Sequence, residues 1–338
     1  MCPFFTGVLM KNPSRIIFKI VVALILVGLL SPDVFAQQWP TGVTKILVPY
    51  LTGTAPDTMA RLMARKLSEK TGKPFIVENK PGANSIIGTG YVVHAPADGS
   101  VILLVDTSAL VVNPLLYKSL PYDARKDLAS VSLFGDDPMY LIASAEFPPN
   151  NWAEFVAYAK AHPGKVVFGS GGNGHISHLN LESMQDAAGI KLLHVPYKGM
   201  ADVIPALLSN TAQVSISGIG NVEKLVEQKK IKVFAIGGAN RSSLTPGVPS
   251  TKELTGNADM IISTAFSLHV PAATPAATVQ KISQAAAAVL TDPEVLKFTS
   301  QLGYEARAST PQALDQRLDQ FNVVFSKIVK DHKIQIQN

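Results

Sequence analysis

The chain has 338 residues and a formal net charge of +5, with 47% hydrophobic and 16% charged residues. This mild positive balance, without a basic stripe interleaved with aromatic side chains, argues against a nucleic-acid-binding surface. The single cysteine, Cys2, excludes disulfides and thiolate metal sites in the rest of the chain.

The N-terminal segment has the features of a secretory signal. Three basic residues within 11–19 precede an apolar run over residues 20–30, and a small-residue exit ends at Ala36. The run is shorter than the roughly 20 apolar residues that an uncleaved membrane anchor needs. We therefore predict a signal peptide over residues 1–36, cleavage after Ala36, and a periplasmic mature protein without a membrane span.

Short β-branched runs alternate with helical stretches through the rest of the chain, which predicts a mostly parallel α/β sheet covered on both faces. In chain order we predict strands over residues 45–48, 75–78, 101–104, 131–134, 140–143, 166–168, 192–195, 214–216 and 232–236. We predict helices over residues 57–70, 152–161, 177–188, 200–208, 222–228, 275–290 and 312–329. A mature chain of about 300 residues exceeds what one compact core serves, so we expect two lobes.

Three loops that join a strand to a helix have an unusual composition. They cover residues 49–57, 169–175 and 195–199 and are rich in Gly, Pro, Thr and Ser. In open α/β sheets, ligands bind beyond the carboxyl ends of the strands. Each loop presents backbone N–H groups and the positive end of a helix dipole there. The three loops therefore predict an anion-binding site.

Many short motifs resemble the Bug family, the extracytoplasmic receptors of tripartite tricarboxylate transporters. No single motif is specific, but they follow one another in order along the mature chain. The motifs that carry the resemblance include ILVPY at 46–50, VENKPGA at 77–83, SGGNG at 170–174 and HVPYKG at 194–199.

The resemblance implies a type II periplasmic-binding-protein-like α/β fold, with two α/β lobes, a cleft between them and crossing hinge strands. By analogy, the first lobe comprises residues 37–139 plus 263–338, and the second comprises residues 140–262. It also implies a monomer that binds a small organic carboxylate and delivers it to the membrane permease subunits of a tripartite tricarboxylate-type transporter.

The resemblance and the loop positions together suggest which residues contact the ligand, mainly through backbone amides and water. In the first lobe these are Tyr50, Thr52, Gly53, Thr54, Ala55, Thr107 and Ser108. In the second lobe they are Ser170, Gly172, Asn173, His178, Pro196, Tyr197 and Gly199. We expect hinge closure on a dicarboxylate or an aromatic carboxylate, and no catalytic residue, metal or cofactor. Asp57 beside the first loop would repel an anion, so we interpret it as a structural brace.

The chain departs from the family pattern at three places. Pro56 removes one amide donor from the first loop. The segment 217–221 lacks a carboxylate that family members often carry, which disfavours a ligand with an ammonium group. A common Trp is replaced near Ala265, and the small residues there and at 217–221 together predict a roomier cleft for a bulkier acid.

Alternative functions remain open at this point. A sensor that signals to a membrane kinase would have the same sequence features, and a nucleoside or phosphate receptor would use the same anion-binding loops. A periplasmic serine hydrolase would use Ser170 or Ser177 with His178, but the chain has no Gly-x-Ser-x-Gly elbow and no acid placed to orient the histidine. His175 and His178 lack further ligands at the spacing of a zinc site.

Overall fold

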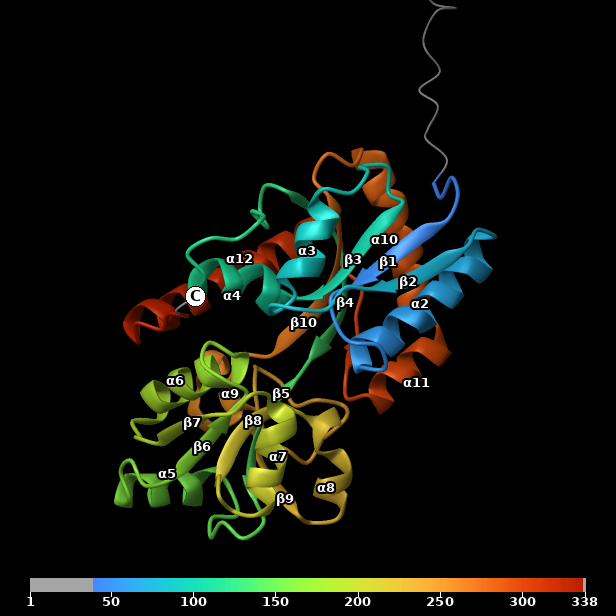
Figure 1. Cartoon of the computed structure of the whole chain (residues 1–338). Coiled ribbons are helices and arrows are strands. Elements are labelled where there is room, and N and C mark those ends of the chain that lie inside the picture. Colours follow the sequence, from blue (N-terminus) through green and yellow to red (C-terminus); the bar gives the residue numbers. More distant parts are fainter. Residues whose placement is uncertain (1–38, 337–338) are drawn as a thin grey trace, which may run out of the picture. The chain divides into compact units, whose positions relative to one another are not determined.

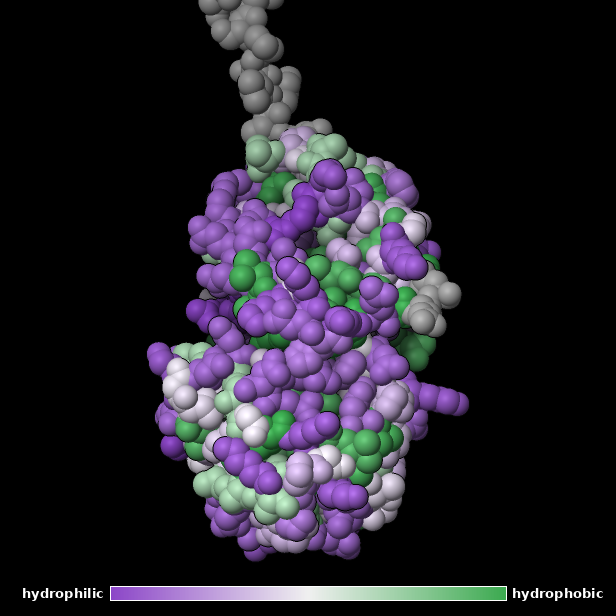
Figure 2. Space-filling view, turned by 90° about the vertical axis from the view of Figure 1, so that its left-hand side faces the viewer, coloured by the Kyte–Doolittle hydropathy of each residue, from purple (hydrophilic) through white to green (hydrophobic). Residues whose placement is uncertain are grey.

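The computed structural model describes residues 39–336, so the predicted signal peptide lies outside the described residues. These residues form two mixed β-sheets, each covered by helices (Figure 1). No helix within residues 39–336 has the length and apolarity that a bilayer-spanning segment requires. The face seen in Figure 2 is mostly hydrophilic, with hydrophobic residues in small separate groups.

The first sheet has six strands in the order β11-β4-β10-β3-β1-β2. They are β1 (Thr44–Val48), β2 (Phe75–Asn79), β3 (Val101–Asp106), β4 (Leu128–Asp137), β10 (Thr264–Pro271) and β11 (Glu305–Ala306). Strands β1, β2 and β3 are parallel, whereas β10 runs antiparallel to both β3 and β4. Ile46, Leu47 and Val48 of β1 are all fully buried, as expected for a strand covered on both faces.

Besides the C-terminal helix over Pro311–Asp331, which contacts β4, five helices of the described residues pack against this sheet or its edge (Figure 1). They are α2 (Ala55–Thr71), α3 (Ile86–Val93), α4 (Thr107–Leu116), α10 (Ala276–Leu290) and α11 (Pro293–Gln301). The sequence of α2 explains both of its ends, because Pro56 occupies the first turn and Gly72 adopts the left-handed conformation that ends the helix. Its buried residues Met59, Met63 and Leu67 recur every four positions and form one apolar face.

The second sheet has five strands in the order β7-β6-β8-β5-β9. They are β5 (Met139–Ser144), β6 (Val167–Ser170), β7 (Leu193–Pro196), β8 (Val214–Gly218) and β9 (Ile231–Ile236). The associated helices are α5 (Trp152–Ala161), α6 (Ile176–Ala188), α7 (Met200–Leu208), α8 (Glu223–Glu227) and α9 (Thr251–Thr255). Strands β6, β7 and β8 are parallel, and β5 is antiparallel to both of its neighbours.

The chain passes between the sheets twice. Strand β4 ends at Asp137 and β5 begins at Met139, so Pro138 alone separates the two sheets at the first crossing. The second crossing runs from the end of β9 to the start of β10. Helix α12 (Pro311–Asp331) packs along α4 and β4 and also contacts α6. The two-lobed type II fold is confirmed, whereas the lobe boundaries stay a prediction.

Several elements were absent from the sequence prediction. Helix α3 contains Gly88 and Gly90, which weaken its helical signal, and α4 is apolar around most of its circumference and contains Pro114. Every residue of β10 is buried, so its sequence shows no alternation. The predicted ligand contacts Thr107 and Ser108 are the first residues of α4, because β3 continues to Asp106 and α4 begins directly afterwards.

Candidate functional site

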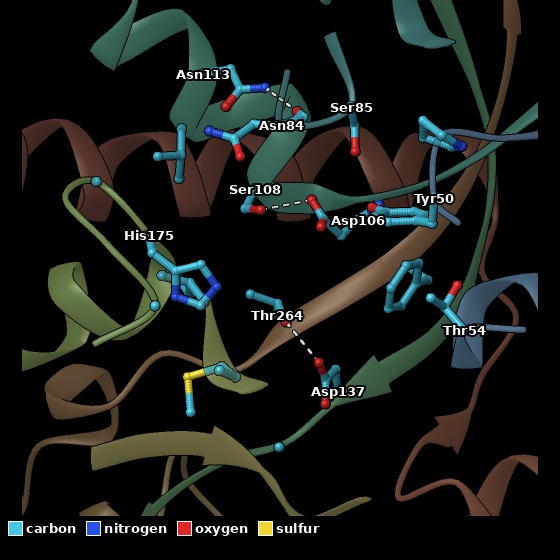
Figure 3. A pocket seen from close by; sticks show the side chains of 18 of the residues that line it. Tyr50, Thr54, Asn84, Ser85, Asp106, Ser108, Asn113, Asp137, His175 and Thr264 are labelled. Carbon is cyan, nitrogen blue, oxygen red and sulfur yellow. Dashed lines mark hydrogen bonds between the residues drawn. The ribbon is translucent and has the colours of Figure 1, made fainter. Parts of the chain in front are cut away.

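A cleft of about 540 Å³ is lined by residues of both sheets and of the loops that follow their strands (Figure 3). From the first sheet, its lining includes Tyr50 after β1, Asn84 and Ser85 after β2, and Ser108 after β3. From the second sheet, it includes Asn173 after β6 and the end of β8. The cleft therefore lies at the carboxyl ends of the parallel strands, where α/β proteins bind their ligands.

Five helices begin at this cleft. The residues that cap α2, α3, α4 and α6 are Thr54, Ser85, Asp106 and His175, and all four line the cleft, as does Met200, the first residue of α7. Each helix N-terminus carries roughly half a positive charge and unpaired N–H groups. Among the described lining residues none is Lys or Arg. Attraction for an anion therefore comes from the backbone.

The first loop brings two of its five predicted residues to the cleft, Tyr50 and Thr54, whereas Thr52, Gly53 and Ala55 are outside the lining. The Gly53 amide donates to Asp57 Oδ2 over 2.8 Å, and the Thr52 hydroxyl donates to Asn79 Oδ1 over 3.2 Å. These groups hold the loop together, so they are not directed at the cleft.

The buried side chain of Asp57 holds this loop through hydrogen bonds. It is almost fully buried and accepts hydrogen bonds from Gly53 N, Arg61 Nε and Asn79 Nδ2 at 2.8 to 3.0 Å. Burial acts to raise the pKa of Asp57, but the bonds from Arg61, Gly53 and Asn79 outweigh it and hold that pKa below its ordinary value. The interpretation of Asp57 as a structural brace is confirmed.

Tyr50 and Asp106 join β1 to the start of α4. The Asp106 amide donates to the Tyr50 hydroxyl over 3.0 Å, and the Tyr50 ring packs edge-on against Phe266. Asp106 Oδ1 accepts from Ala109 N and from the Ser108 hydroxyl, both at 2.7 Å. Asp106 is thus the N-cap of α4, and the predicted residue Ser108 lines the cleft with its hydroxyl directed at Asp106.

Ala265, one of the two places expected to make the cleft roomier, lies outside the cleft lining. Side chains alternate along β10, so Thr264 and Phe266 face the cleft while Ala265 points away and is fully buried. The predicted ligand residue Thr107 is also buried, and its hydroxyl accepts the Ala265 N–H at 3.3 Å.

The glycine-rich loop after β6 supplies Asn173 to the cleft, but Ser170 and Gly172 are outside the lining. The amides of Gly171, Gly172 and Gly174 donate to the side chains of Ser177, Ser170 and His178, at 3.0 to 3.2 Å. The prediction that this loop cradles an anion with its glycine amides is wrong for these three groups, because Ser170 and two side chains of α6 already accept their N–H groups.

His178 lies behind the loop and not in the cleft lining. Its Nδ1 accepts the Gly174 N–H, and its ring stacks on His194 with centroids 4.1 Å apart. Burial, and then the neighbouring His178, lower the pKa of His194 to about 4. His194 Nε2 is 2.6 Å from Ser170 Oγ. His178 therefore anchors the loop, as one interpretation of the sequence held.

The predicted residues of the third loop, Pro196, Tyr197 and Gly199, are outside the lining, whereas Met200, the first residue of α7, is part of it. The Tyr197 amide donates to Ser170 O over 2.9 Å and continues the pairing of β6 with β7. These contacts keep Tyr197 beside the glycine-rich loop.

Sequence reasoning missed the loop between β2 and α3. Ala83, Asn84 and Ser85 all have positive φ, a conformation that costs energy for residues other than Gly. Asn113 Nδ2 donates to Asn84 O over 2.8 Å, and the Asn84 side chain donates to the Tyr117 hydroxyl. The position of this loop after a strand could have identified it as part of the site. The weak helical pattern of α3 hid the junction between the strand and the helix.

His175 projects into the cleft (Figure 3). Its Nδ1 accepts the Ser177 N–H at 3.2 Å, and burial lowers its pKa, which favours the neutral ring. Within residues 39–336 no group of three or more His, Cys, Asp and Glu side chains is arranged to hold a metal ion.

Asp137, at the end of β4, is the second carboxylate of the cleft lining, and sequence reasoning missed it (Figure 3). Thr264, its cross-strand partner on β10, donates to Asp137 Oδ2 over 3.4 Å. A Cβ at Gly218 of β8 would lie 2.7 Å from Asp137 Oδ1. Burial raises the pKa of Asp137 to about 7. A carboxylate therefore lines the cleft next to segment 217–221, which has none of its own.

Comparisons with known proteins find similarity to receptors and periplasmic binding proteins. A sequence profile described as tripartite tricarboxylate transporter family receptor matches residues 59–333. The protein BugT of Bordetella pertussis is 31% identical over 264 residues, which cover 78% of this chain and 80% of BugT.

Two solved structures are similar over most of the chain. The periplasmic binding protein BugD is 29% identical with a TM-score of 0.73, and the similarity covers 88% of this chain and all of BugD. The R. palustris protein Rpa4515, solved with adipate, is 26% identical with a TM-score of 0.77, over 88% of this chain and all of that protein.

Proposed function

Since the chain belongs to the tripartite tricarboxylate transporter receptor family, we propose that it captures a small organic carboxylate in the periplasm by closing its two lobes around it. The observation that carries this proposal is the convergence of five helix N-termini on one cleft without a Lys or Arg among the described lining residues. Backbone amides at helix N-termini are a ready site for a carboxylate.

The mechanism is hinge closure. The two chain crossings, at Pro138 and between β9 and β10, are the natural pivots. Tyr50, Thr54 and Ser108 come from one sheet, and Asn173 and Met200 come from the other. A ligand that contacts both sets gains most in the closed form and shifts the population toward it.

The signal peptide directs export of the protein across the inner membrane. The closed receptor, a monomer, then docks on the membrane permease subunits of a tripartite tricarboxylate-type transporter. The adipate in the R. palustris relative supports a ligand of similar size. A sensor for a membrane kinase would use the same closure, and the genes beside this one would distinguish the two.

The geometry speaks against the serine hydrolase alternative. Ser170 and Ser177 are both fully buried, and neither hydrogen-bonds to His178 through its hydroxyl. Ser170 is bonded to His194 and Ser177 to His175, so neither of these two serines is presented to a substrate in the cleft.

A thermal-shift screen of residues 37–338 tests the proposal. The panel contains mono-, di- and tricarboxylates, aromatic acids, amino acids and inorganic phosphate. A ligand specific to the folded state stabilises it by about 2.7 kcal/mol at a hundred times its dissociation constant. We expect a shift with a carboxylate and none with phosphate. A shift with phosphate alone, or with no compound that carries a carboxylate, would overturn the proposal.

A further inference from the structure

Asp137 has unused acceptor capacity that is directed into the cleft. Within the described residues it accepts one hydrogen bond, the 3.4 Å contact from the Thr264 hydroxyl. Asp106, the other lining carboxylate, accepts two bonds of 2.7 Å from the first turn of α4. An ionised carboxylate has about four acceptor positions. Asp137 is therefore the lining carboxylate with the greater capacity to bind a ligand donor.

The fold around Asp137 provides room for its carboxylate at the cleft. It is the last residue of β4, directly before the Pro138 crossing, and it reaches the end of β8 because Gly218 has no side chain there. The residue remains partly exposed, and the exposed part faces the cleft (Figure 3). A ligand held between the two sheets thus meets Asp137 where the chain passes from one to the other.

The charges of the cleft are unequal along its length. Ser85, Asp106 and His175, which cap α3, α4 and α6, lie along one part of the wall, whereas Asp137 lies with Thr264 at another part (Figure 3). No Lys or Arg of the described lining neutralises Asp137. A ligand carboxylate beside an ionised Asp137 would be repelled, and a ligand cation would be attracted, more strongly than in water.

We propose that the ligand carries a protonated amine in addition to its carboxylate, and that Asp137 binds this ammonium group while the helix N-termini hold the carboxylate. This inference rests on the proposed function and names the class of ligand within it. It replaces a second carboxylate, the group expected from the sequence, with a cation.

The protonation of Asp137 should make the affinity for such a ligand depend on pH. Burial raises the pKa of Asp137 to about 7 in the empty cleft, and an ammonium partner would lower it. Affinity for an amine-bearing ligand then rises between pH 6 and pH 8, whereas affinity for a dicarboxylate falls. The other ionisable groups that act on Asp137, or on which it acts, are Asp106, Asp136, Tyr140 and Tyr304.

Matched ligand pairs test the inference by isothermal titration calorimetry on the mature protein. Aminocaproate is paired with adipate, aminovalerate with glutarate, and leucine with its hydroxy-acid analogue, so that the members of each pair differ mainly at one group. In at least one pair we expect the amine to bind about tenfold more tightly. Tighter binding of the partner that lacks the amine, in every pair that binds, would overturn the inference.

Asp137→Asn keeps the shape of the side chain and removes its charge. We expect this variant to lose about tenfold in affinity for the amine and to retain or gain affinity for the paired carboxylate. Asp259→Asn removes one charge from an exposed residue outside the cleft lining and is the matched control. An unchanged amine affinity in Asp137→Asn would overturn the inference, as would an equal loss in Asp259→Asn.

The two proposals fail in different ways. If carboxylates without an amine bind and Asp137→Asn leaves the amine affinity unchanged, the ammonium site is wrong and the carboxylate receptor stands. If no carboxylate-bearing compound binds, with or without an amine, the proposed function fails and the ammonium site fails with it.

Discussion

Gly218 provides the space that the Asp137 carboxylate occupies, because a Cβ at Gly218 would lie 2.7 Å from Asp137 Oδ1. The two residues belong to different sheets, β8 and β4, and meet beside the first chain crossing. The position of the acidic group in the cleft therefore depends on a residue that has no functional group of its own.

Gly218→Ala tests this relationship. The added methyl group meets the carboxylate, so we expect a loss of about 1 to 3 kcal/mol in the free energy of unfolding. Gly247→Ala is the control, since a Cβ at Gly247 has nothing within 4 Å. In an Asp137→Ala background the cost of Gly218→Ala should shrink, as measured by urea denaturation of all four proteins. An equal cost in both backgrounds would mean that the two residues do not interact.

The raised pKa of Asp137 predicts a pH-dependent stability of the unliganded protein. Its folded-state pKa of about 7 exceeds the ordinary value of 3.8, so the folded protein holds this proton more tightly than the unfolded chain. The stability that this tighter proton binding gives the folded protein is fully present below pH 4 and is lost as the pH rises to about 7. Within that window the slope approaches about 1.4 kcal/mol per pH unit.

The unfolding free energies of the native protein and of Asp137→Asn, compared from pH 5 to pH 8, isolate this contribution. The native protein should lose stability relative to the variant up to about pH 7 and then run parallel to it. A constant difference over the whole range would show that Asp137 titrates normally.

The lowered pKa of His269 predicts the opposite pH dependence of stability at acid pH. It is buried in β10 with its Nε2 2.8 Å from Ser267 Oγ, and burial lowers its pKa from 6.5 to about 3. The stability that the neutral ring contributes is present above pH 6.5 and is lost as the pH falls toward 3.

His269→Gln removes the titrating group and should flatten the acid limb of the stability curve between pH 6.5 and pH 4. Its stability at pH 7.5 is the reference, because the mutation also changes packing. His162→Gln, at an exposed position, is the control. An unchanged acid limb in His269→Gln would contradict the prediction.

Asp57→Ala should loosen the first loop. It removes the acceptor of the Gly53 amide and leaves Asn79 Nδ2 and Arg61 without this partner, so we expect a loss of about 1 to 3 kcal/mol in unfolding free energy. Ligand affinity should fall as well, because Thr54 and Tyr50 flank the braced turn. Glu69→Ala removes an exposed carboxylate paired with Arg65 and should cost less than about 1 kcal/mol. Equal losses in the two variants would show that Asp57 is no more than a surface charge.

The sequence by itself indicated a two-lobed α/β architecture, and part of the loops that it singled out reaches the cleft. Alternating strands and helices are local patterns, and the rule that ligands bind beyond strand ends turned them into a site prediction. Tyr50, Thr54, Ser108 and Asn173 do line the cleft. The bracing role of Asp57 followed from its charge beside an anion site.

Only the tertiary structure decided which donors and acceptors of the site remain available. A glycine-rich loop has the same sequence whether its amides face a ligand or, as at Gly171 and Gly174, side chains of the helix that follows it. Asp137 enters the cleft through the pairing of β4 with β10 and its contact with Gly218, which lie 127 and 81 positions away along the chain. Periodicity reports the conformation of neighbouring residues, whereas charge in a cleft depends on residues that only folding brings together.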